Sequence, residues 1–162
     1  MGTGNLPPYS DRRKRLRESV ARGWLLLYQG GEYFNENLYY LTGVDAFHTF
    51  ALISLESSFE VLVTNPFQFH EIREGCTIED IRAVPPREIA PTIIRMLSEN
   101  SVSLLYTDYS FESRLPLPGE LLDRMKKSMP GIRVEPLPAQ LQRMRMIKDP
   151  TEISTIKRGI GV

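Results

Sequence analysis

The stretch NENLYYLTGVDAFHTFALISL, residues 35–55, decides the fold. It joins an aromatic segment, a Leu-Thr-Gly bend and a lone histidine, His48, to a strongly apolar run. The alternation of residues 39–42 predicts a short strand with one buried face, and Gly43 permits a positive φ at the turn that follows. The run over residues 48–55 predicts a second, more deeply buried strand.

Working outward, short apolar runs alternate with amphipathic segments. Residues 59–64 follow residues 48–55 across Glu-Ser-Ser, a polar connection that predicts a hairpin. Such an alternation predicts an α/β domain of three layers, in which helices flank a central mixed β-sheet. The remaining predicted strands cover residues 24–28, 102–108 and 131–137, and the predicted helices cover residues 11–22, 65–75, 87–100, 118–129 and 138–147.

Caps and breakers place the ends of these helices. Ser10 predicts the first N-cap and Asn65 another, with Pro66 at the first helical position. Pro91 is expected within the first turn of its helix, where a missing N–H is harmless. The basic cluster over residues 12–17 is typical either of a solvated helix face or of a nucleic-acid patch, and the absence of a second cluster favours the solvated face.

Composition excludes several classes of function. The 162 residues suit one domain, and 20 basic against 20 acidic residues leave no net charge to attract nucleic acid. No apolar run approaches the roughly 20 residues that span a bilayer, and residues 1–10, which we expect to be disordered, lack the core of a signal peptide. A single cysteine, Cys76, fits a reducing compartment. We therefore expect a cytoplasmic protein with neither nucleic-acid nor membrane partners.

No catalytic or metal-binding motif is present. The chain has two histidines, His48 and His70, and neither CxxC nor HExxH spacing. Cys76 has no neighbour in sequence that would activate it, and His70 lies beside Glu71 on a predicted solvated face. The sequence therefore predicts no catalytic residue, no metal ligand and no cofactor within this chain.

Two segments resemble the N-terminal domain of the creatinase, prolidase and aminopeptidase P family. NLYYLTGV, residues 37–44, is similar to an "N-F-Y-Y-L-T-G" stretch of that family, and QRMRMIKDPTEISTIKRG, residues 142–159, is similar to the phrase that opens its second domain. The resemblance implies that residues 11–142 form the N-terminal domain. Residues 143–162 would then be a linker and the first helix of a catalytic domain that this chain lacks.

The resemblance also implies a function for a longer parent protein. In the family, the pita-bread domain holds two metal ions, of manganese, cobalt or zinc, and most members cleave Xaa-Pro peptide bonds, with creatine-type hydrolysis a minor option. The peptide substrate would then meet this domain at a cleft rim, for which the resemblance nominates Tyr40, Asp45, Phe47 and His48. The resemblance further implies a homodimer. Its expected apolar surface comprises Phe47, Met144, Met146, Ile147, Ile153 and Ile156.

Several alternatives remain open. His48 can be a substrate contact or a hydrogen-bonded structural residue. The arginines at 143, 145 and 158 can bind a phosphate or, as we expect, pair with Asp149 and Glu152. The chain can be a shortened piece of a peptidase or a naturally short product. In the second case it would be a stand-alone binding or scaffold module without enzymatic activity.

Overall fold

A computed structural model describes residues 8–31, 34–108 and 118–161. Its centre is a six-stranded sheet in the order β4-β3-β2-β1-β5-β6. β2 runs antiparallel to both of its neighbours, and the other pairings are parallel, so the sheet is mixed as predicted. The strands are β1 (Trp24–Gln29), β2 (Thr49–Ser54), β3 (Glu60–Thr64), β4 (Ile81–Ala83), β5 (Leu104–Thr107) and β6 (Arg133–Pro136).

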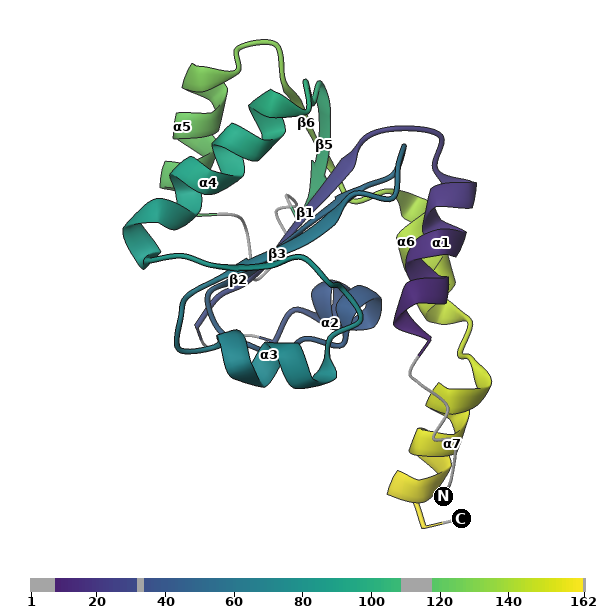
Figure 1. Ribbon diagram of the computed structural model, residues 1–162. Coiled ribbons are helices and arrows are strands. Elements are labelled where there is room, and N and C mark those ends of the chain that lie inside the picture. Colours follow the sequence, from purple (N-terminus) through teal and green to yellow (C-terminus); the bar gives the residue numbers. More distant parts are fainter. Residues whose placement is uncertain (1–7, 32–33, 109–117, 162) are drawn as a thin grey trace.

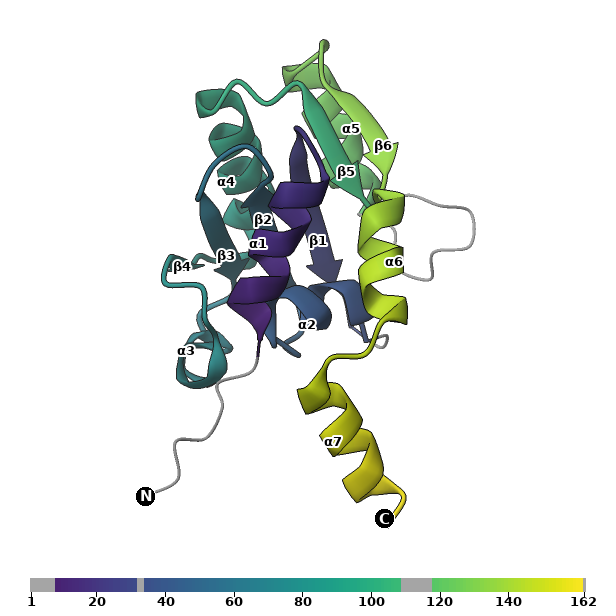
Figure 2. The ribbon, with the colours of Figure 1, turned by 90° about the vertical axis from the view of Figure 1, so that its right-hand side faces the viewer.

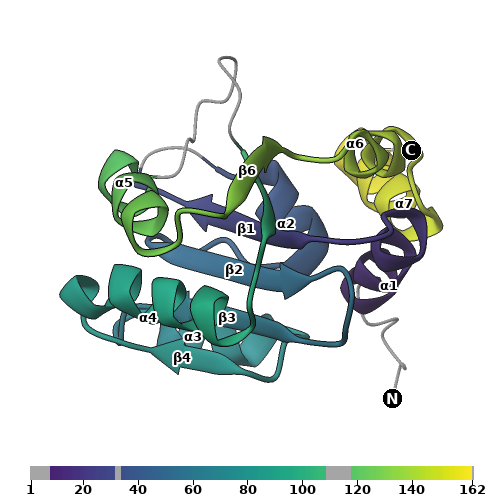
Figure 3. The same ribbon diagram turned by 90° about the horizontal axis from the view of Figure 1, so that it is seen from above.

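Helices cover both faces of this sheet, which confirms the predicted three layers (Figure 1). α4 and α5 lie side by side on one face, as the view from above shows (Figure 3). α1, α2, α3 and α6 contribute to the core on the opposite face. The helices are α1 (Tyr9–Ser19), α2 (Glu36–Thr42), α3 (Phe69–Gly75), α4 (Pro86–Glu99), α5 (Gly119–Ser128), α6 (Ala139–Met146) and α7 (Pro150–Gly159).

The central strand β1 explains the two cores. Its side chains alternate between the faces, so Leu25 and Leu27 join the core under α1 and α2, whereas Leu26 joins the core under α4 and α5. All three leucines are completely buried. A continuous apolar run is what a strand buried on both faces requires, and the prediction for residues 24–28 is confirmed.

The basic cluster on α1 is a solvated face only at Lys14 and Arg15, which are exposed; for the buried Arg12 and Arg13 that prediction was wrong. Arg13 is 2% exposed, its Nε lies 2.9 Å from Glu60 Oε2 and its Nη1 donates to the Leu41 carbonyl at 2.7 Å. Arg17 donates to the same Glu60 carboxylate from the next turn of the helix. Burial would raise the pKa of Glu60, but hydrogen bonds from both guanidiniums outweigh it and lower that pKa. The pair therefore fixes α1 against β3.

Residues 36–42 form the helix α2, so the predicted short strand there was also wrong. The Asn35 side chain caps α2 by accepting from the N–H groups of Asn37 and Leu38, at 3.0 and 2.9 Å. Gly43 ends the helix with φ +74° and donates to the Tyr39 carbonyl, as a left-handed C-terminal cap does. A Cβ at Gly43 would lie 2.4 Å from the Tyr9 ring, so the bend needs glycine both for its φ and for its space.

Three smaller predictions about helix ends need correction. Ser10 lies inside α1. The N-cap residue of this helix is Pro8, which makes no side-chain hydrogen bond to it. α3 begins at Phe69, although the Asn65 side chain does accept from the N–H of Phe67, at 2.9 Å. Pro91 lies beyond the first turn of α4, which starts at Pro86. The predicted disorder of residues 1–10 falls mostly on residues 1–7, outside the described part of the chain.

Candidate functional site

The junction between α6 and α7 is the part of the molecule that points most clearly to a function. α6 packs on the domain through Leu141 and Met144, which are 0% and 8% exposed. α7 then extends away from the domain (Figure 2), and none of its residues is buried among those that the structure describes. Its exposed apolar side chains include Ile153 and Ile156. The helix is therefore attached to the domain at its first turn.

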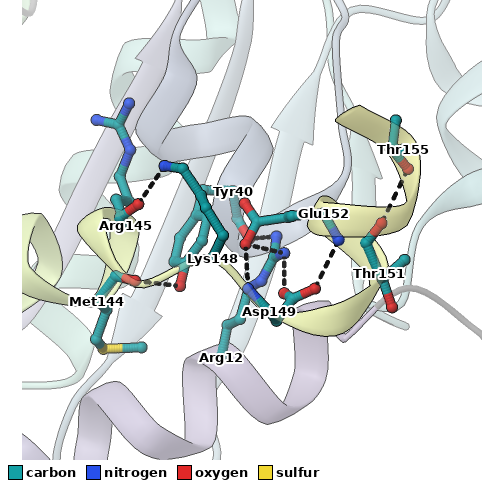
Figure 4. Close-up of polar contacts among 9 residues, drawn as sticks. All are labelled: Arg12, Tyr40, Met144, Arg145, Lys148, Asp149, Thr151, Glu152 and Thr155. Carbon is teal, nitrogen blue, oxygen red and sulfur yellow. Dashed lines mark hydrogen bonds and ion pairs between the residues drawn. The ribbon is translucent and has the colours of Figure 1, made fainter. Parts of the chain in front are cut away.

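Arg12 makes that attachment (Figure 4). Its guanidinium is buried against the Tyr40 ring, with Cζ 4.1 Å from the ring centroid, and Nη1 donates to the Tyr40 carbonyl at 3.0 Å. Nη2 donates to the Asp149 carboxylate and lies 3.4 Å from Glu152 Oε2. One buried cation thus joins α1, α2 and the start of α7. Removing it would leave two carboxylates near the aromatic ring without their counter-charge.

The start of α7 is itself a reciprocal capping box. Asp149 Oδ1 accepts from the Glu152 N–H at 2.9 Å, and Glu152 Oε2 accepts from the Asp149 N–H at 3.0 Å. Burial alone would raise the pKa of the Asp149 carboxyl. The hydrogen bonds from Arg12 and from backbone N–H groups outweigh burial and hold that pKa below its usual value. Asp149 is therefore charged at neutral pH, where it both caps α7 and binds Arg12.

The start of α2 is tied to the same region. Arg145 Nη1 donates to Asn37 Oδ1 at 2.9 Å, and Nη2 donates to the Glu36 carboxylate. Asp108, just past β5, accepts from Asn35 and Asn37 at 2.9 and 3.0 Å, while burial raises its pKa. Arg145 therefore pairs with an acid, as expected, but its partner is Glu36 instead of Asp149 or Glu152, which pair with Arg12.

A groove of about 540 Å³ lies between α7 and the helices α1 and α2. The Tyr9, Phe34 and Tyr39 rings lie on its domain side, and Ile156 lies on its α7 side. Phe34 and Tyr39 are 47% and 40% exposed. The groove is thus an accessible surface of mixed aromatic and charged character beside the attachment point of α7.

The predicted rim residues fall in two places. Tyr40 is 6% exposed and its hydroxyl donates to the Met144 carbonyl at 3.2 Å, so it belongs to the α6–α7 junction. Asp45, Phe47 and His48 lie in the exposed loop between α2 and β2. In that loop His48 has a φ of +53°, and its Nδ1 lies 3.3 Å from the Tyr28 hydroxyl.

The predicted apolar surface is accessible except at one position. Met144 is buried at 8% exposure, so its inclusion was wrong, because α6 packs it onto the domain. The other predicted residues have exposed fractions from 43% to 78%: Phe47, Met146, Ile147, Ile153 and Ile156.

Sequence reasoning missed Arg12, although part of the signal was readable. Asp149-Pro150-Thr151-Glu152 has the spacing of a capping box, and this pattern predicts the N-terminus of a helix. Nothing in the sequence indicates that the partner of this box lies 137 residues earlier on α1.

The side chains of the described residues do not fit a metal centre. No group of three or more His, Cys, Asp or Glu side chains is placed to hold an ion within residues 8–31, 34–108 and 118–161. At the junction, Asp149 and Glu152 both already pair with Arg12. Burial also raises the pKa of the Cys76 thiol, which disfavours the thiolate that binds metals. Over the same ranges, no helix has both the length and the apolar character that a membrane span requires.

With this geometry established, comparison with known proteins identifies the family. The sequence matches the family described as Creatinase/Prolidase N-terminal domain over residues 12–147, and the chain belongs to that family. No protein among those with curated descriptions matches this chain in sequence.

Solved structures share the fold. An X-Pro aminopeptidase from Thermotoga maritima MSB8 superimposes with a TM-score of 0.73 at 17% identity, over 89% of this chain and 39% of its own. A prolidase from Pyrococcus horikoshii OT3 gives a TM-score of 0.69 at 19% identity, over 91% and 38%. This chain thus spans about two fifths of their length. The N-terminal domain of the cytoplasmic peptidase PepQ from Mycobacterium tuberculosis H37Rv matches over 83% of this chain and 98% of its own, with 15% identity and a TM-score of 0.63.

Proposed function

We propose that this chain is the non-catalytic N-terminal domain of a metal-dependent, cytoplasmic Xaa-Pro peptidase. In this role it holds a separate catalytic domain in a fixed orientation, forms part of the rim of the substrate cleft and contributes to a homodimer. The metal pair, of manganese, cobalt or zinc, and the groups that cleave the peptide belong to the catalytic domain. No step of the reaction is assigned to the residues of this chain.

The observation that carries the proposal is the way α7 is held. Its first turn is fixed by a capping box and by the buried Arg12, whereas its apolar residues Ile153 and Ile156 remain 43% and 50% exposed. An amphipathic helix of 10 residues has little stability of its own, so an exposed apolar face of this kind calls for a neighbour. A catalytic domain that continues from α7 would supply that neighbour. The contacts of Arg12 with the start of α7 would then fix the orientation of that catalytic domain.

The exposed loop between α2 and β2 supports the part of the proposal that concerns the cleft. Asp45, Phe47 and His48 lie in this loop, and Phe47 is 52% exposed without a packing role in either core. A large exposed aromatic beside a charged residue and a histidine suits contact with a peptide. Tyr40 takes part only indirectly, because it supports Arg12 and the junction.

The direct test is to read the gene beyond the codon for Val162 and to express the longer protein. We expect a frame that encodes two Asp, one His and two Glu as metal ligands, and a product that hydrolyses Xaa-Pro dipeptides or peptides in the presence of manganese. Chelation should abolish this activity, and residues 1–162 alone should show none with any of the three metals.

Arg12 provides a sharper test in the longer protein. Arg12→Gln should lower kcat/KM for an Xaa-Pro peptide by about tenfold, because displacing a catalytic domain even slightly is costly. Arg15→Gln, on the exposed side of the same helix, is the matched control and should leave kcat/KM unchanged. A stop codon directly after Val162, or a longer protein without metal-dependent Xaa-Pro hydrolysis, would refute the proposal and favour a stand-alone binding module.

A further inference from the structure

A second cavity, of about 330 Å³, lies on the other side of the sheet from α1 and α2. It opens beside Tyr28 and Asn65, which are at the carboxyl ends of β1 and β3, and beside the first turns of α4 and α5. We call it the edge cavity. In open α/β sheets the space beyond the carboxyl ends of parallel strands is where ligands commonly bind. Its size falls within the range of small-molecule pockets.

Two helix N-termini converge on the edge cavity because of the strand directions. β4 and β5 are parallel to β1, so α4 and α5, which follow them, both begin at the same edge of the sheet. Pro86 and Arg87 of α4 and Glu120 of α5 line the cavity. Each helix is preceded by a proline, and neither has a side-chain cap among the described residues. The free N–H groups and the dipoles of both helices therefore favour an anion here.

Asn65 supplies an independent indication of a ligand. It is 8% exposed and lines the edge cavity. Its Oδ1 accepts from the N–H groups of Phe67 and Gln68, at 2.9 and 3.3 Å, which fixes the side chain. Its Nδ2 donates to no atom within the described ranges of the chain. This amide group therefore keeps a donor for an acceptor in the cavity, and an anion would provide one.

The walls show what kind of anion would fit. Tyr28 and Phe50 stack with their ring centroids 4.3 Å apart, and with Ile89 they form an apolar wall. Arg87 and Arg124 bring positive charge, and each has an exposed acid beside it: Glu88 lies 3.6 Å from Arg87, and Glu120 lies 3.8 Å from Arg124. Donors from two helix ends, an amide and two guanidiniums exceed what two carboxylate oxygens can accept. Three phosphate oxygens match them better.

We propose that the edge cavity binds a small organic phosphate monoester, with the phosphate between the N-termini of α4 and α5 and a flat apolar body against Tyr28 and Phe50. The inference goes beyond the proposed function, since it concerns residues 1–162 alone and needs no catalytic domain. A peptidase could be inactive and the site real, or the reverse.

The test is a titration of the isotope-labelled chain with phenyl phosphate, monitored by NMR. We expect saturable shifts at the side-chain amide of Asn65 and at the backbone amides of Arg87 and Glu120. Inorganic phosphate and benzoate should bind at least about tenfold more weakly, because each lacks either the apolar body or the third oxygen. Phenol should not shift these resonances at the same concentration.

Variants locate the site. Asn65→Asp keeps the acceptor for Phe67 and Gln68 but replaces the donor by a negative charge, so phenyl phosphate affinity should fall at least about tenfold. Arg124→Gln, which does not touch a core, should weaken binding several-fold, and Glu120→Gln should strengthen it. Arg95→Gln, two turns further along α4, is the matched control and should bind as the wild type does.

Three results would overturn the proposal. If phenol bound as tightly as phenyl phosphate, the cavity would be an apolar pocket without a phosphate site. Inorganic phosphate binding equally tightly would mean an adventitious ion only. Wild-type affinity in both Asn65→Asp and Arg124→Gln, with unchanged melting temperatures, would place any binding elsewhere on the chain.

Discussion

Arg12 on the first helix donates to Asp149 at the start of the last one, across 137 positions of sequence. The Arg12 side chain is the more buried of the two partners, and its guanidinium also lies over the Tyr40 ring. It fixes the direction in which the chain leaves the domain. An ion pair of this kind is worth more for geometry than for stability, because desolvation offsets much of its attraction.

The first prediction concerns this contact. Arg12→Gln should let α7 open more often, because the variant loses charge-assisted hydrogen bonds worth about 1.5–3 kcal/mol. We expect amide exchange over residues 150–159 to become at least about tenfold faster, measured by hydrogen–deuterium exchange mass spectrometry. Arg15→Gln is the control on the same helix. Equal exchange in both variants would mean that Arg12 does not hold α7.

The second prediction concerns the other buried guanidinium of α1. Glu60→Leu should cost about 3–5 kcal/mol of unfolding free energy, because it leaves Arg13 buried at 2% exposure without a counter-charge. Glu79→Leu, at an exposed position, should change the free energy by no more than about 0.5 kcal/mol. Urea denaturation measures both, and similar midpoints for the two variants would contradict a structural role for Glu60.

The third prediction is a dependence on pH. Hydrogen bonds from Arg13 and Arg17 outweigh burial and lower the pKa of Glu60 in the folded chain. Its stabilising effect is therefore complete above the unfolded-state pKa of about 4.3 and is lost as the pH falls through the lower folded-state pKa. Wild type should lose more stability between about pH 5 and pH 3 than Glu60→Gln does. Parallel urea curves for the two proteins over that interval would show that Glu60 is not the titrating group.

Most of the sheet and the two helical layers that cover it could be predicted from the sequence, because the signals for these elements are local. Residues 24–28 are apolar throughout, which predicts a buried strand. Residues 87–100 have the periodicity of an amphipathic helix, which predicts α4. The strand prediction for residues 39–42 failed because Tyr-Tyr-Leu-Thr is too short a segment to distinguish a strand from the end of a short helix. The deciding signal was the Asn35 cap. β4 was missed because three residues give no periodicity.

The junction could not be predicted, and the reason is physical. A row of arginines on one helix is usually solvated, because burying a guanidinium needs a partner placed by the fold. The partners of Arg12 and Arg13 are Asp149 and Glu60, and neither spacing is visible in one sequence. The capping box of α7 was readable, but its contact with α1 was not.

The fourth prediction tests the cores. Leu26→Ala and Leu104→Ala should each cost about 2–5 kcal/mol, because both side chains are buried, at 0% and 6% exposure, and truncation leaves a cavity. Ile160→Ala, at 68% exposure, is the surface control and should be nearly neutral. Denaturant midpoints equal to wild type in both leucine variants would be incompatible with the layers described.

The last prediction concerns association, which we propose from exposed apolar residues. Phe47 is 52% exposed, and Ile153 and Ile156 on α7 are 43% and 50% exposed. Apolar surface of this kind tends to find a partner, and a two-fold pair is the commonest closed arrangement. We expect a homodimer whose dissociation constant rises at least about tenfold in Ile153→Asp or Phe47→Asp, because a buried charge at an interface is strongly unfavourable. Lys157→Asp, which changes the charge of the same helix at an exposed polar position, is the control. Light scattering across a concentration series distinguishes the outcomes. A wild type that stays monomeric at high micromolar concentration would refute the dimer. A dimer insensitive to both Ile153→Asp and Phe47→Asp would place the interface away from α7 and from the loop between α2 and β2.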